Sequence, residues 1–361
     1  MRIHITDIID GDQLSGDVFN DYGLHVLSKG TKLYKNEISR LLQHHIDFVD
    51  IRDREKLSEA SSSAEAAPAD ARTLESTVNP KWLPKVQPIY ENAVKSFEKF
   101  FAAALETGKV DDQEVTNVLQ PLLNNLQLER DVVSMLLLLN TQDDYTYQHS
   151  VQVGMLSYYL ATWLGYPAGE AVKIGKAGFL HDIGKCRIED AILNKPGKLT
   201  PEEYELVKRH TEFGHDIILQ SFEDTSLALG ALQHHERIDG SGYPGKLSGD
   251  EIHPVSKIIA VVDIYSAMIS ARVYQEERDL LFVLKELHRL SFKELDPVVT
   301  HTFIKHMIPN FIGKRVKLSN GSIGIIVMTH PTEFFSPLIQ VDQRFIDLTA
   351  EREYEITHVY M

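Results

Sequence analysis

The most restrictive feature of the sequence is a long central stretch in which apolar residues recur at helical spacing. From Tyr145 to about Pro309 the pattern is almost continuous and is interrupted mainly by glycine-rich segments. Apolar residues spaced three and four positions apart are typical of helices that bury one face, whereas strands alternate with a period of two. We therefore expect a mainly α protein built around one helical domain, residues 141–310.

The segments around this domain differ from it in character. Residues 1–53 alternate short apolar runs with turns, which predicts a small, strand-rich α+β domain with one helix. Residues 54–79 have almost no large apolar side chains, so we expect a flexible linker. Residues 80–140 carry two further helical patterns. Residues 311–361 predict a short β unit, with a hairpin signal at Ser319-Asn320-Gly321.

The composition excludes several classes of function. The chain has 37 Lys and Arg residues against 52 Asp and Glu residues, a formal net charge of −15. This balance argues against binding to duplex nucleic acid or to an anionic membrane, because both need a basic face. Cys186 is the only cysteine, so a disulfide or a cysteine-based zinc site within the chain is excluded.

The sequence also predicts where the protein is found. The start, MRIHITDIIDGD, has acidic residues where a signal peptide needs an apolar run. Every apolar run in the sequence is far shorter than the ~20 residues of a spanning helix. We therefore expect a cytoplasmic protein without a membrane span.

Two acidic positions in the helical domain indicate chemistry. In GFLHDIGK, a helix would place Lys185 on roughly the same face as His181 and Asp182. These groups suit a metal with an anionic substrate, although a helix end with a surface Asp–Lys pair explains them equally well. Asp263 lies in an apolar pattern that predicts a buried helix. A buried carboxylate needs a metal or a charged partner, and taken alone a salt bridge or a helix cap is the simpler explanation.

Histidines on other segments extend this set. His234 and His235 are adjacent, and adjacent helical side chains diverge by ~100°, so both can bind one metal only near a helix end. His210 and His149 each precede apolar residues at helical spacing, and each alone is more typical of a core or surface histidine. Nitrogen and oxygen ligands together suit Fe, Mn, Zn or Ni better than Ca or Mg. Two such metals sharing Asp182 would clamp a phosphoryl displacement.

The glycine-rich loop after His235 matches a nucleotide motif only formally. Gly240 to Gly245 reads GxGxxG, but the segment follows no predicted strand and opens no predicted helix. The loop therefore does not predict a dinucleotide-binding fold. Its glycines permit a tight turn and a close approach of the backbone to a ligand, or only a surface turn.

In this order, the motifs closely resemble the HD-GYP family, a branch of the HD phosphohydrolases. The resemblance covers about residues 140–310 and rests on His181-Asp182, His234-His235-Glu236 and Asp239-Gly240-Ser241-Gly242-Tyr243-Pro244. It implies an all-helical HD-type domain that holds two or three metals, usually iron or manganese. It also implies hydrolysis of cyclic di-GMP to pGpG and often on to GMP.

The resemblance further implies a role for individual residues. One metal would be held by His149, His181, Asp182 and Asp263, and the second by Asp182, His210, His234 and His235. Asp182 would bridge the two metals, together with a hydroxide that attacks phosphorus. Lys185 and Arg272 would contact substrate phosphate, and Tyr243 and Gly242 would lie at the rim. Asp182 and Lys185 are accordingly the predicted catalytic residues.

Three positions depart from the family pattern. Ser266 stands where many members have an acid, and Gln275 where many have a basic residue. Both positions bear on substrate binding, and neither is a metal ligand. Members with three metals carry a glutamate one turn before the first histidine ligand, where this chain has Tyr145. We therefore expect two divalent metals, unless Asp144 reaches the site from a non-helical turn.

The sequence leaves three functions open. The first is a cyclic di-GMP phosphodiesterase, and the second is a hydrolase of the same fold that acts on another cyclic dinucleotide or nucleotide phosphate. The third is a non-catalytic receptor for cyclic di-GMP, against which the complete set of ligands argues. The predicted partners are cyclic di-GMP as the substrate, and a second copy of the chain or a signalling protein.

Overall fold

The structure, a computed structural model, describes residues 83–126, 145–269 and 280–360, and parts of the segment 2–52. Two compact units divide the chain. One comprises Met1–Pro80, Gly313–Ile325 and Ile356–Met361, and the other comprises Lys81–Ile312 and Ile326–Glu355. The expected mainly α fold is confirmed, whereas the domain boundaries expected from the sequence remain predictions.

The N-terminal segment is built from short strands, as its alternation of apolar runs and turns predicts. Strand β1 (Arg2–His4) pairs antiparallel with β4 (Phe48–Asp50), and β2 (Val18–Phe19) pairs antiparallel with β3 (His25–Leu27). A small apolar cluster holds these strands together, with Leu14, Leu33, Leu41 and Ile51 fully buried. The expected linker, residues 54–79, lies outside the described residues.

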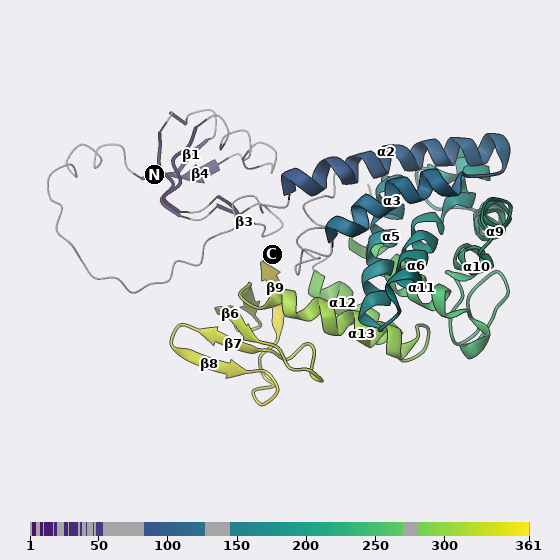
Figure 1. The fold of residues 1–361 in the computed structure, drawn as a ribbon. Coiled ribbons are helices and arrows are strands. Elements are labelled where there is room, and N and C mark those ends of the chain that lie inside the picture. Colours follow the sequence, from purple (N-terminus) through teal and green to yellow (C-terminus); the bar gives the residue numbers. More distant parts are fainter. Residues whose placement is uncertain are drawn as a thin grey trace. The chain divides into compact units, whose positions relative to one another are not determined.

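Four helices form one side of the helical domain (Figure 1): α2 (Leu83–Thr107), α3 (Asp112–Leu126), α5 (Tyr145–Trp163) and α6 (Ala168–Leu180). Helix α5 is buried along its length from Gln148 to Ala161, and α2, α3 and α6 all pack on it. The α5–α6 contact is close because glycines line it. A Cβ added at Gly178 would lie 2.5 Å from Ser157 Oγ, and one at Gly154 would lie 2.8 Å from Phe179 Cβ.

The remaining helices complete this domain and, together with α5 and α6, carry the candidate site. They are the 3₁₀ helix η3 (Ile183–Arg187), α7 (Asp190–Leu193), α8 (Pro201–Lys208), α9 (His210–Ser221), α10 (Thr225–Gln233), η4 (Gly249–Glu251), α11 (Pro254–Ile269), α12 (Leu280–Leu290), α13 (Pro297–Met307) and η5 (Ile308–Phe311). Helix α11 packs on α5, α10 and α12. Its buried residues include Ile258, Ile259, Val261 and Val262, so it is an interior helix, as its apolar sequence predicts.

The C-terminal residues form a five-stranded antiparallel sheet with the order β8-β7-β6-β5-β9. Its strands are β5 (Arg315–Leu318), β6 (Ile323–Met328), β7 (Leu338–Val341), β8 (Arg344–Asp347) and β9 (Ile356–Tyr360). The expected hairpin is confirmed, because β5 and β6 pair in the register Arg315↔Ile325. Gly321, with a φ of +86°, provides the left-handed residue that this turn needs.

Among the helices that the structure describes, none combines the length and the apolar character that a membrane crossing requires.

Candidate metal centre

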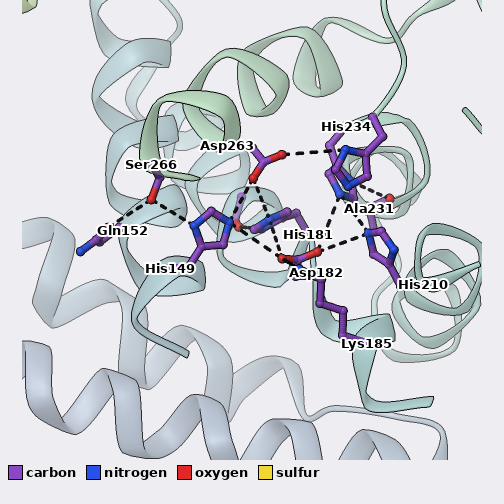
Figure 2. A network of polar contacts seen from close by, with 12 residues as sticks. His149, Gln152, His181, Asp182, Lys185, His210, Ala231, His234, Asp263 and Ser266 are labelled. Carbon is purple, nitrogen blue, oxygen red and sulfur yellow. Dashed lines mark hydrogen bonds and ion pairs between the residues drawn. The ribbon is translucent and has the colours of Figure 1, made fainter. Parts of the chain in front are cut away.

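The histidines and aspartates singled out in the sequence meet at one place in the helical domain (Figure 2). His149 lies near the start of α5 and Asp263 in the second half of α11. The other residues lie at helix ends: His181 and Asp182 between α6 and η3, His210 at the first position of α9, and His234 and His235 directly after α10. Adjacent His234 and His235 thus occupy the helix-end position that shared metal binding requires.

Asp182 lies at the centre of the cluster, and its two oxygens face different groups. Oδ2 is 3.2 Å from His181 Nε2 and 2.5 Å from Lys185 Nζ. Oδ1 is 3.3 Å from His210 Nε2 and 3.8 Å from His234 Nε2. Two groups of three potential ligands follow, one of His149, His181 and Asp182 and one of His210, His234 and His235. Asp182 therefore has the geometry of a bridging carboxylate.

Asp263 closes the cluster from the opposite side. Its Oδ1 is 3.0 Å from His149 Nε2 and 3.8 Å from His181 Nε2, while its Oδ2 is 4.0 Å from His235 Nδ1. Asp263 thus belongs mainly to the group of His149 and His181. Its second oxygen also reaches the side of His235.

Backbone carbonyl groups orient three of the imidazole rings in the same way. His181 Nδ1 lies 2.7 Å from Gly178 O, His210 Nδ1 lies 2.6 Å from Val207 O, and His234 Nδ1 lies 2.8 Å from Ala231 O. A carbonyl oxygen can only accept, so each Nδ1 donates its hydrogen. In a neutral ring Nε2 then carries the lone pair, and each of these Nε2 atoms faces Asp182. This is how metal-binding histidines are commonly held.

Several buried polar atoms in the cluster lack the partner that a cation would supply. Within the described residues, His181 Nε2 and Asp182 Oδ1 are buried and make no hydrogen bond. His210 Nε2 and His234 Nε2 lie 3.3 Å apart, and the orientation of both rings turns two lone pairs toward each other. Buried groups of this kind are costly unless they are satisfied, so the residues present fit divalent metal ions.

The pKa values of His210, His234, His235 and Asp182 favour the protonation states that bind metal. Burial lowers the pKa of His210 to about 4 and that of His235 to about 3. Burial also lowers the pKa of His234, and the neighbouring His235 lowers it further. Burial raises the pKa of the Asp182 carboxyl, but His181 and Lys185 outweigh burial and hold this pKa well below its usual range. These imidazoles are therefore neutral and the carboxylate is ionised near neutral pH.

A chain of hydrogen bonds orients His149 from behind. Ser266 Oγ donates to Gln152 Oε1 at 3.1 Å and lies 3.1 Å from His149 Nδ1. Because its hydrogen goes to Gln152, the Ser266 oxygen accepts from His149, and the Nε2 lone pair then faces Asp263. Gln152 Nε2 in turn donates to the hydroxyl of Tyr90 on α2 at 3.4 Å. The serine that replaces the usual acid thus contacts a predicted metal ligand.

Of the four predicted substrate-binding residues, Lys185 and Tyr243 lie against the histidine and aspartate cluster, Gly242 packs against backbone, and Arg272 is not described. Lys185 adjoins Asp182, and the Tyr243 ring stacks on His235 with ring centroids 4.7 Å apart. Gly242 packs against the protein's own backbone, since an added Cβ would lie 2.5 Å from Glu236 Cα and from His235 O. Arg272, Gln275 and Asp144 lie outside the described residues, and of Tyr145 only the backbone is described.

Sequence reasoning gave no role to three residues that shape the site. Glu236 is buried and accepts hydrogen bonds from the backbone N–H groups of Gly245 and Leu247, which ties the glycine-rich loop to the histidine pair. An acidic residue directly after two histidines could have indicated in the sequence that Glu236 belongs to the site. Lys208, whose ammonium lies 5.6 Å from the centroid of the Tyr243 ring, and Gln152 carry no signal of their own, because their positions depend on how the helices pack.

Part of the chain is similar to known proteins. Residues 132–299 match the family model described as HD domain. A cyclic di-GMP phosphodiesterase from Pseudomonas aeruginosa is 34% identical over 233 residues, which cover 64% of this chain and 56% of that protein. A cyclic di-GMP phosphodiesterase from Thermotoga maritima is 41% identical over 186 residues, 50% of each chain. A 3'3'-cGAMP-specific phosphodiesterase from Vibrio cholerae is 34% identical over 168 residues, 46% of this chain and 39% of that protein.

The chain covers 56%, 50% and 39% of the length of these three relatives.

Proposed function

We propose that the protein is a metal-dependent phosphodiesterase that hydrolyses cyclic di-GMP, because residues 132–299 match the HD domain family model and carry the motifs of the family that the sequence resembles. The observation that carries the proposal is the position of Asp182, whose two oxygens face two separate groups of histidines. A carboxylate so placed suits a pair of metals around one reacting phosphate. The expected first product is linear pGpG, and GMP would follow from a second hydrolysis.

We propose that the seven candidate ligands divide into the two sets that the family resemblance implies. His149, His181, Asp182 and Asp263 would hold one divalent ion, and Asp182, His210, His234 and His235 would hold the second. This mixture of imidazole and carboxylate ligands suits iron, manganese, zinc or nickel, and among these the family resemblance favours iron or manganese. When bound, the two ions supply a water that is nucleophilic at neutral pH and neutralise charge on the phosphoryl oxygens.

The protein's own residues would bind and orient the substrate. The Lys185 ammonium lies 2.5 Å from Asp182 Oδ2, and its side chain is 25% exposed, so it reaches both the metal position and solvent. It can therefore donate to a phosphoryl oxygen where negative charge develops. Arg272 is proposed to contact a substrate phosphate, and Tyr243 to border the site beside His235.

A second candidate substrate is 3'3'-cGAMP, because one relative at 34% identity is a phosphodiesterase specific for it. The two cyclic dinucleotides differ in one purine base, whereas the metals would act on a phosphate. The choice between them therefore depends on residues at the rim. The cytoplasmic location and the association with a second copy or a signalling protein stay predictions.

Product chromatography on the full chain tests the proposal. The protein is purified without oxygen, loaded with iron or manganese, and incubated with cyclic di-GMP, 3'3'-cGAMP and cyclic di-AMP. We expect pGpG from cyclic di-GMP and loss of this activity in Asp182→Ala, together with loss of bound metal. Full activity and metal content in Asp182→Ala would contradict the two-metal site. Hydrolysis of 3'3'-cGAMP alone would assign the second candidate.

A further inference from the structure

The metal centre reaches solvent mainly on the side of His235. The His235 side chain is 21% exposed, whereas those of the other six candidate ligands are between 0% and 12% exposed. A substrate that approaches the metals on this side passes the groups that surround His235. The residues at this edge are the ones that can distinguish one substrate from another.

An aromatic and cationic stack extends outward from His235. The Tyr243 ring lies on the His235 imidazole at an interplanar angle of 27°. The ammonium of Lys208 lies 5.6 Å from the centroid of the Tyr243 ring and 5.3 Å from that of the Tyr204 ring. The order from the metal centre outward is thus imidazole, phenol ring, ammonium and a second phenol ring.

Helix α8 holds the outer two groups in place. Tyr204 and Lys208 are four residues apart and share one face of this helix. The helix begins with a capping box between Thr200 and Glu203 and has a proline at its first position, so its start is well defined. The two side chains are therefore presented by a regular helix beside the glycine-rich loop.

Both outer groups are available to a ligand. Tyr204 is 49% exposed. The Lys208 side chain is 23% exposed and pairs with Glu205 at 2.6 Å. Because the Glu205 side chain is 69% exposed, this carboxylate is well solvated and the pair contributes little. The ammonium can exchange this partner for a phosphate at small cost. Since the chain has a net charge of −15, an anionic substrate needs such local cations at its entry side.

We propose that Tyr204 and Lys208 form a subsite for the half of the cyclic dinucleotide that is not being cleaved. The proposal rests on the proposed function. Lys208 binds the second phosphate, and the exposed Tyr204 ring stacks on the purine next to it. Aromatic rings bind bases through their π faces, and a cation next to the ring adds a charge-assisted contact to phosphate. The subsite thus selects a purine dinucleotide over a simple phosphodiester.

Kinetics with two substrates test this subsite on the manganese-loaded full chain. Cyclic di-GMP has the second phosphate and the purines, whereas bis(p-nitrophenyl) phosphate has a cleavable diester and neither of them. The variants are Tyr204→Ala and Lys208→Met, which keeps an unbranched side chain over the rings. Arg209→Ala is the matched control, because it removes the same charge at the next position, where the guanidinium lies 4.8 Å from the Phe213 ring.

We expect Tyr204→Ala and Lys208→Met each to raise KM for cyclic di-GMP roughly 10- to 100-fold. Turnover of bis(p-nitrophenyl) phosphate and metal content should stay within about threefold of the wild type, and Arg209→Ala should leave KM for cyclic di-GMP unchanged. Unchanged KM in both variants, or equal losses with both substrates, would overturn the subsite. A wild-type protein that cleaves only bis(p-nitrophenyl) phosphate would overturn the proposed function, even with the metal centre intact.

Discussion

Substituting Gly184 by alanine should disrupt the metal centre without removing any ligand. Gly184 lies in η3, two residues after Asp182, where η3 packs on the first turns of α9. An added Cβ would lie 2.0 Å from the carbonyl oxygen of His210 and 2.3 Å from the backbone nitrogen of Gly214, whereas real Cβ contacts essentially never fall below 3.0 Å. Both obstacles are backbone atoms, so η3 and α9 must separate by about 1 Å.

The same displacement would change the distance between two candidate ligands. Asp182 moves with η3 and His210 with α9, and their Oδ1 and Nε2 atoms lie 3.3 Å apart. Metal–ligand distances tolerate only about 0.2 Å of error. We therefore expect Gly184→Ala to lose most of its bound metal. Overpacking of this kind also lowers the free energy of unfolding by about 1–3 kcal/mol.

Metal content by mass spectrometry and thermal unfolding of the chelated protein check this prediction. Gly169→Ala is the matched control, because a Cβ at Gly169 in α6 meets nothing within 4 Å. Replacing a helical glycine by alanine there should keep the metal and raise the free energy of unfolding, by at most about 1 kcal/mol. Wild-type metal content and melting temperature in Gly184→Ala would refute the close contact between η3 and α9.

Three further predictions concern single groups. Lys185→Met should keep both metals and lower kcat/KM for cyclic di-GMP roughly 10- to 100-fold, since one charge-assisted phosphate contact is lost; loss of metal would instead show that the lysine positions Asp182. Ser266→Val should weaken metal binding about 10-fold or more in a chelator competition, while Ser266→Thr, which keeps the hydroxyl, should not; equal effects of the two would contradict the hydrogen bond to His149. The chelated protein should lose stability as the pH falls from 6.5 toward 4. The pKa of His210 is about 4 in the folded chain and 6.5 in the unfolded chain, so the unfolded chain binds more protons in this range. The free energy of unfolding should therefore fall by about 3 kcal/mol. Urea unfolding at several pH values measures this loss, and a flat profile would contradict the neutral buried imidazole.

The sequence predicted the segments that meet at the site because local patterns determine them. The run around Asp263 is apolar almost all round, which predicts an interior helix, and α11 is one. The divergence of adjacent helical side chains required a helix end at His234 and His235, and α10 ends at Gln233. These predictions needed only the helical repeat and the cost of burying charge.

The contacts between segments could not be read from the sequence. Ser266 contacts His149 across 117 positions, and Gln152 contacts Ser266 across 114. These pairs depend on the crossing of α5 and α11, which a hydrophobic repeat does not specify. The position of Lys208 beside Tyr243 could not be read from the sequence either. It depends on how α8 packs against the glycine-rich loop, which begins at Gly240. Tertiary packing decides such contacts, so they are found only in the folded chain.

The helix ends explain why the cluster tolerates so many buried imidazoles. The last carbonyl groups of a helix have no intrahelical donor, and Gly178, Val207 and Ala231 lie in the last turns of α6, α8 and α10. Their oxygens accept from the Nδ1 atoms of His181, His210 and His234. Each of these hydrogen bonds thus adds a side-chain donor at a helix end and fixes the ring that faces Asp182. Helix C-termini also carry partial negative charge, which favours a nearby cation. The same three helix ends therefore orient the ligands and contribute to the field that attracts the metal.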